Sequence, residues 1–203
     1  MMFDLAKLKN VVLYIFANCD AAHLGAVKLN KVLYYADMLH YADNGAPLTG
    51  ATYRKRALGP MCDQLSSVLK DLERSGDIEI GESIYFGYKK REYRSKKRHD
   101  AGSLTNLQTD LLNEIVDFVC NQNSAKTISE LSHNRAWEMV DFGQIITYKS
   151  AIHMFPIDVS SDTMDWAGKE VARLADKNSE IGALDYKLFS DLRNGILERV
   201  RQQ

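Results

Sequence analysis

The residues whose types and spacing could do chemistry lie in one stretch, residues 28–41. Asp37 and His40 stand three positions apart there, a spacing that could bring a general acid and a general base to one side of a helix. At about 100° per residue, however, His40 projects about 60° away from Asp37, toward the apolar side of such a helix. The spacing therefore favours a core histidine, satisfied by one hydrogen bond, over an acid–base pair.

Other patterns for catalysis or metal binding are absent from the sequence. The five histidines show no His-x3-His spacing and the three cysteines no Cys-x2-Cys spacing, so we expect no metal and no cofactor. Neither a glycine-rich phosphate loop nor Gly-x-Ser-x-Gly occurs. The sequence does not decide whether a Cys–His nucleophile pair exists, because such residues meet only in three dimensions. No cysteine has a sequence context that would activate it. We expect a protein that is not an enzyme.

The three cysteines and the N-terminal residues indicate the cellular compartment of the protein. Cys19, Cys62 and Cys120 are odd in number and far apart, as is typical of unpaired thiols in a reducing environment. The first residues lack the basic and apolar pattern of a secretion signal. No apolar run approaches the ~20 residues that a membrane helix needs. We therefore expect a cytoplasmic protein that does not act on a membrane.

The stretch 28–41 is expected to belong to a helix over residues 24–43. It contains no proline or glycine, and Asn44-Gly45 supplies a stop signal at its end. Its apolar face is predicted to consist of Leu29, Val32, Leu33, Ala36, Leu39 and His40. A neighbouring polar face is predicted to consist of Asn30, Tyr34, Asp37 and Tyr41. Such a polar face fits either the boundary of a core or a surface that binds a partner.

The remaining patterns predict an α+β fold that is mainly helical. Further helices are expected at residues 4–18, 61–75 and 105–121, and another is expected from residue 127. The helix at 61–75 is expected to begin at Gly59-Pro60. A small antiparallel element is expected from residues 49–55 and 77–95. Pro156 predicts a boundary between a domain at 1–155 and an extension at 156–203. The extension is expected to form a C-terminal helical hairpin from residues 162–177 and 185–201.

Three short segments follow one another in a distinctive order. They are KLNKVLYYAD at residues 28–37, GAPLTGATY at 45–53 and ALGPM at 57–61. This order resembles the SocA-like antitoxin domain, also called the Panacea domain, well over residues 28–72 and more weakly through about residue 153. The resemblance implies a phage-associated type of antitoxin that neutralises a cognate toxin by direct binding. For some members it also implies an adaptor role that delivers the toxin to a cellular protease, and it implies no catalytic motif.

Five residues around the central helix are our candidates for binding the toxin. They are Tyr34, Asp37, Tyr41, Tyr53 and Arg54. Tyrosine and arginine are enriched among the residues that dominate protein interfaces, which supports the choice in general terms. The family resemblance does not itself identify these positions as a contact site.

A basic segment near the middle of the chain suggests a second kind of partner. Its candidate contact residues for a partner protein or a nucleic acid are Lys89, Lys90, Arg91, Lys96 and Lys97, with aromatic residues interleaved. Together with the helix at 61–75, the segment also resembles a winged helix, so a DNA-binding regulator is the alternative function. Nucleic acid is the less favoured partner, because the chain carries a net charge of −1 and the helix has few basic groups.

Overall fold

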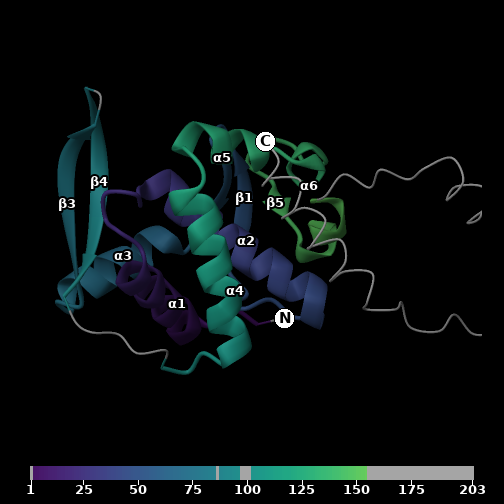
Figure 1. Cartoon of the computed structure of the whole chain (residues 1–203). Coiled ribbons are helices and arrows are strands. Elements are labelled where there is room, and N and C mark those ends of the chain that lie inside the picture. The colour runs from purple at the N-terminus through teal and green to yellow at the C-terminus, as the bar shows by residue number, and fades with distance from the viewer. Residues whose placement is uncertain (1, 86, 97–101, 155–203) are drawn as a thin grey trace, which may run out of the picture. The chain divides into compact units, whose positions relative to one another are not determined.

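The computed structural model describes residues 2–85, 87–96 and 102–154, and Figure 1 shows the arrangement of their helices and strands. The fold is mainly helical with small antiparallel sheets, which confirms the α+β class. The chain forms one compact unit over Met1–Met154. The expected helical hairpin beyond residue 156 lies outside the described residues, and the division into 1–155 and 156–203 stays a prediction.

Helix α2 (Ala26–Asn44) is the centre of the fold. Helix α4 (Asn106–Val116) lies beside it in Figure 1, strand β2 (Gly59–Cys62) also packs on it, and helix α1 (Leu5–Asn18) packs on α4. Residues 29–38 are therefore buried all the way round the helix. Neighbouring elements cover both the apolar and the polar face, so Asn30, Tyr34 and Asp37 do not form an exposed surface for a partner. The stop at Gly45 is confirmed: its backbone is left-handed, with φ 69°, and its N–H donates to Tyr41 O.

A three-stranded antiparallel sheet packs against α2. It has the order β2–β1–β5, with β1 at Tyr53–Arg56 and β5 at Ile145–Ile146. The register pairs Cys62, Tyr53 and Ile146 across the strands, and all three are buried. The next pairs bring Met61, Arg54 and Ile145 side by side on the opposite face, and we call these three residues the outer row.

Strand β2 corrects one sequence-based prediction. Gly59-Pro60 does not begin a helix, because residues 59–62 pair with β1, and the helix that follows, α3, spans only Leu65–Arg74. Proline is compatible with this position because β2 is an edge strand, where one N–H is not needed for pairing.

The hairpin expected within residues 77–95 is confirmed as strands β3 (Ile78–Tyr85) and β4 (Tyr88–Ser95). It forms a separate two-stranded sheet, so residues 49–55 and 77–95 do not belong to one antiparallel element. The hairpin lies beside α1 and α3, on one side of the helices in Figure 1. Phe16 of α1 stacks on Tyr93 of β4, with ring centroids 5.1 Å apart, which ties the hairpin to the helical core.

The last described elements are short. Helix α4 begins with a capping box between Thr105 and Gln108 and continues as a π-helical turn, η1 (Asp117–Asn121). Helix α5 (Ala125–Leu131), helix α6 (Arg135–Glu138) and a 3-10 turn, η2 (Tyr148–His153), follow. None of the helices in the described ranges has both the length and the apolar character needed to cross a bilayer.

Candidate functional site

The structure separates the five candidate toxin-binding residues into two groups. Tyr34, Asp37 and Tyr53 are buried in the core, with at most 1% of each residue exposed. Tyr41 and Arg54 are partly exposed. The first three therefore cannot contact a partner directly in this structure, because Tyr34 and Asp37 lie on the enclosed helix α2 and Tyr53 of β1 packs against that helix. Toxin binding by Tyr41 and Arg54 stays a prediction.

Asp37 is the centre of a buried hydrogen-bond network. Its Oδ1 accepts from Thr49 N at 2.5 Å, and its Oδ2 accepts from Thr49 Oγ1 at 2.6 Å. The Tyr53 hydroxyl lies 2.7 Å from the same Oδ2 and 2.8 Å from Leu33 O. Burial raises the pKa of Asp37 above its usual range, and the bonds from Thr49 and Tyr53 counteract this only in part. The network joins α2 to the segment that leads into β1.

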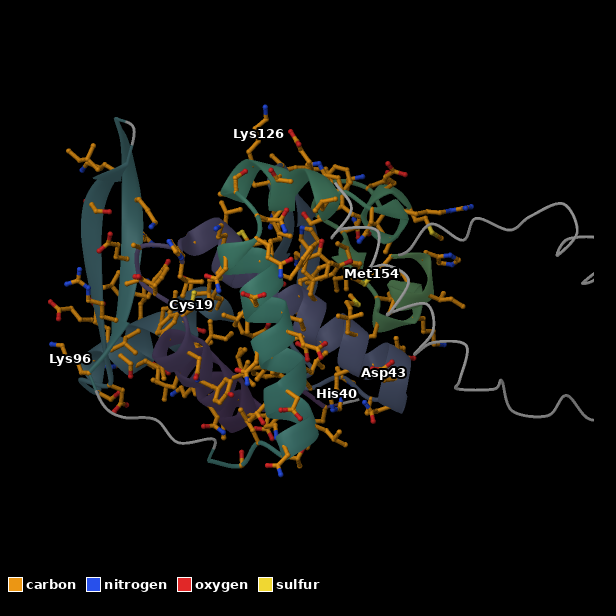
Figure 2. All side chains as sticks on the ribbon, viewed as in Figure 1. Cys19, His40, Asp43, Lys96, Lys126 and Met154 are labelled. Carbon is orange, nitrogen blue, oxygen red and sulfur yellow. The ribbon has the colours of Figure 1, made fainter. Side chains whose placement is uncertain are left out.

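His40 has partners of its own. Its Nδ1 lies 2.7 Å from Ala46 O, and its Nε2 lies 3.3 Å from Gln108 Nε2. Figure 2 shows its position near the end of α2. The hydrogen bonds of Asp37 and those of His40 thus go to different groups, as the helical angle between them predicted, but His40 is partly exposed and is not the core histidine that the spacing favoured.

Arg54 connects the sheet to the loop before β5. Its Nε donates to Asp63 Oδ2 at 2.6 Å, and its Nη1 donates to Gly143 O at 3.1 Å. Its neighbours in the outer row are open to solvent, since Met61 is 47% and Ile145 is 44% exposed. Phe142 is also exposed, and the guanidinium of Arg56 lies 5.9 Å from the centre of its ring. The outer face of the sheet is thus an apolar surface interleaved with arginine.

Sequence reasoning missed Lys31, a buried residue of α2. Its Nζ donates to Leu58 O at 2.6 Å and to Pro60 O at 3.1 Å, and Asn30 Oδ1 accepts from Cys62 N at 2.9 Å. These two side chains therefore satisfy the outer backbone edge of β2, which would otherwise stay open to pairing. Burial lowers the pKa of Lys31 to about 7. No spacing in the sequence marks this role, because it depends on where β2 meets the helix.

Replacement of Lys31 by methionine should change how stability depends on pH. The folded pKa of about 7 lies below the ordinary value of 10.5, so the unfolded chain binds more protons between these values. The stability of the wild type should therefore rise with pH across that range relative to Lys31→Met. Near its upper end the variant should be less stable by about 1–3 kcal/mol, because Pro60 O loses its donor.

Denaturant unfolding at several pH values would measure this difference. Lys126→Met is the matched control, because the Lys126 side chain is 87% exposed and its removal should leave the pH dependence unchanged. A constant difference between the wild type and Lys31→Met across the range would show that Lys31 has an ordinary pKa in the folded protein.

The basic hairpin makes several interactions within the protein. Lys89 pairs with Glu82 at 3.6 Å, and Lys96, near the open end of the hairpin in Figure 2, pairs with Glu79 at 3.8 Å. Lys90 Nζ donates to the carbonyl oxygen of Ala22. Arg91 is exposed, and Lys97 lies outside the described residues. Cross-strand carboxylates thus balance part of the positive charge, and contact with a partner or a nucleic acid stays a prediction.

The described residues contain no group of three or more His, Cys, Asp or Glu side chains that could hold a metal ion. Fold and site together define a mainly helical α+β domain with a partly apolar, arginine-bearing sheet face. The family model described as antitoxin SocA-like, Panacea domain, matches residues 29–138, more than half of the chain. The chain therefore belongs to the SocA-like Panacea antitoxin family. Comparisons with curated proteins and with solved structures found no match.

Proposed function

We propose that this protein is an antitoxin that neutralises a cognate toxin by direct protein–protein binding in the cytoplasm, without catalysis. The observation that carries the proposal is the family match over residues 29–138. That range includes most of α2, the strands β1 and β2, and the network around Asp37. The match supports a toxin as the kind of partner, and the structure supplies a surface to test.

The surface that we assign to the toxin is the outer row with the neighbouring residues Arg56 and Phe142. Methionine, aromatic residues and arginine are the types that protein interfaces use most. Arg56 is exposed and has no ion pair among the described residues, so it could meet a carboxylate of the toxin. Arg54 keeps its predicted part in binding, as a member of the outer row.

Two modes of neutralisation follow from binding at this surface. In the first, the antitoxin covers the functional surface of the toxin. In the second, it delivers the toxin to a cellular protease. The abundance of the toxin during co-expression separates them, because occlusion leaves the toxin level unchanged, whereas delivery lowers it until the protease is removed.

The experiment is co-expression with the product of the neighbouring gene, provided that this product arrests growth when expressed alone. The wild type should restore growth and co-purify with it. A Met61→Asp/Ile145→Asp double variant should weaken the affinity at least about 30-fold, the effect expected from the loss of about 2 kcal/mol at an interface hot spot. Isothermal titration calorimetry would measure the affinity, and thermal unfolding would verify the fold.

The control is Leu107→Asp, because Leu107 is 81% exposed on α4 and receives the same kind of change away from the sheet. It should bind the toxin as the wild type does. Equal affinity of the double variant and the wild type would remove the outer row from the interface while the proposed function stands. A toxin that the wild type neither binds nor neutralises would contradict the function itself.

A further inference from the structure

Strand β3 has one backbone edge without a partner strand. It pairs with β4 along its whole length, and the two strands form a sheet of their own. Asp77 O accepts from Lys96 N in continuation of this register, so the backbone of Asp77 faces β4. Because the backbone groups of successive residues point to opposite sides of a strand, those of Ile80, Glu82 and Ile84 point away from β4. Among the described residues outside the hairpin, none forms a backbone hydrogen bond with these three.

The two edges of the hairpin differ in their surroundings. The edge of β4 faces the loop between α1 and α2, since a Cβ atom on Gly25 would lie 4.0 Å from Arg91 O. Strand β3 is the outer of the two strands in Figure 1. Residues 78–85 contain no proline, no lysine and no bulge, which are devices that protect many edge strands from pairing. The carboxylates of Glu79 and Glu82 pair with lysines on β4 or next to it.

We propose that the edge of β3 pairs with the same edge of a second copy of this chain. The two hairpins then form one four-stranded antiparallel sheet about a two-fold axis. In the register that we assign, Gly81 of one copy lies opposite Gly81 of the other, at the axis. Ile80 then lies opposite Glu82 of the second copy. Each such pair exchanges two backbone hydrogen bonds, because both residues direct their N–H and C=O groups outward.

The side chains favour a second copy as the occupant. Ile84 is 80% exposed, and the register places it opposite Ile78 of the second copy, which is 1% exposed and belongs to the core. Glu79 lies opposite Ser83, so no two carboxylates face each other. An axis at residue 82 would instead bring Glu82 against its own copy, and like charges directly opposite are destabilising. An axis at residue 83 would leave residues 78–80 without a partner.

This interface is independent of toxin binding, because the hairpin and the outer row belong to different sheets. It is also small, since one edge strand of eight residues from each copy forms it. Stable interfaces bury far more surface than two edge strands supply. We therefore expect a weak dimer, with a dissociation constant between about 10 μM and 1 mM.

Analytical ultracentrifugation of the purified full-length protein, from about 10 μM to 1 mM, tests the association. The average mass of the wild type should rise from that of one chain toward that of two. Glu82→Pro should weaken the association at least about 10-fold, because proline lacks the outward N–H, whereas the bonds to β4 do not use that group. Glu82→Ala is the matched control: it loses the same carboxylate, keeps the N–H, and should associate as the wild type does.

Cross-linking through Gly81→Cys tests the register. Gly81 is exposed, and a Cβ atom there meets nothing within 4 Å. At the axis the two Cα atoms would lie about 4.5 Å apart, within the range that a disulfide spans. In a glutathione buffer, Gly81→Cys should form disulfide-linked dimers at least about 10-fold faster than Ser83→Cys, whose thiol faces residue 79 of the second copy. Peptide mapping would identify the linked residues.

Three results would overturn the proposal. One is a wild type that stays monomeric at about 1 mM. Another is equal association of the wild type and a folded Glu82→Pro, which would place the contact elsewhere on the chain. The third is faster cross-linking of Ser83→Cys than of Gly81→Cys, which would contradict the assigned register. The cross-linking measurement does not depend on the folding of the proline variant, and none of the three requires the toxin.

Discussion

Replacement of Asp37 by alanine is expected to lower the free energy of unfolding by about 3–5 kcal/mol, because the buried donors around the carboxyl group lose their acceptor and each unpaired group costs about 1–3 kcal/mol. The donors are Thr49 N and Thr49 Oγ1, and the Tyr53 hydroxyl loses its contact with Oδ2. Replacement by asparagine should cost far less, because the amide has the same shape and keeps an acceptor for Thr49 N. Chemical denaturation of both variants would measure the two losses.

The small loss of stability expected for Asp37→Asn follows from which atoms carry the hydrogens in the contacts between Asp37, Tyr53 and Leu33. The Tyr53 hydroxyl has one hydrogen, yet it lies within hydrogen-bonding distance of both Leu33 O and Asp37 Oδ2. Both contacts are satisfied if Asp37 Oδ2 carries a proton and donates to the Tyr53 oxygen, while Tyr53 donates to Leu33 O. Burial raises the pKa of Asp37, which extends the pH range over which the protonated form is populated. Asparagine imitates this neutral form, because its amide group donates from the same position.

The pH dependence of stability provides a second test of the protonation of Asp37. Because the folded pKa of Asp37 is raised, the folded chain binds more protons than the unfolded chain between the ordinary value of 3.8 and the folded value. The stability of the wild type relative to Asp37→Asn should therefore be greatest at acidic pH and should fall as the pH rises through that range. A relative stability that rises with pH would show that Asp37 is ionised and stabilised as a carboxylate.

Replacement of Gly59 by alanine is expected to lower the free energy of unfolding by about 2–5 kcal/mol, the sum of backbone strain and overpacking. The backbone there is left-handed, with φ 92°, which costs a residue with a side chain about 1–2 kcal/mol. A Cβ atom would also lie closer than 3.0 Å to Ser132 Oγ and Lys31 Nζ. Both groups are held by hydrogen bonds, Ser132 to Ser129 O and Lys31 to the edge of β2, so overpacking adds about 1–3 kcal/mol.

The matched control for this position is Gly76→Ala. Gly76 has a similar left-handed backbone, with φ 73°, but a Cβ atom there would meet nothing within 4 Å. The Gly76→Ala variant should lose only about 1–2 kcal/mol of unfolding free energy, because backbone strain is its only cost. Thermal or denaturant unfolding would compare the two variants. Equal losses would mean that Lys31 and Ser132 move aside, and that the close packing at Gly59 contributes no stability of its own.

Several elements of this protein follow from the sequence itself. Helix α1 ends at Asn18, as its apolar spacing predicted, and it begins where Asp4 accepts from Lys7 N at 2.9 Å. The end of α2 at Gly45 and the hairpin after Gly76 were likewise predicted. Local signals suffice here, because capping groups, left-handed glycines and periodic apolar residues act within a few positions of one another. The family, too, could be recognised from the order of three short segments.

Only the tertiary structure decided which side chains face the solvent and which meet each other. The polar face expected on α2 is enclosed, because the sheet covers the side on which Tyr34 and Asp37 lie. The periodicity of a helix shows which residues share a side, but it does not show what packs on that side. Strand β2 forms where the helix signal of Gly59-Pro60 is overridden by pairing with β1 and by the bonds from Lys31.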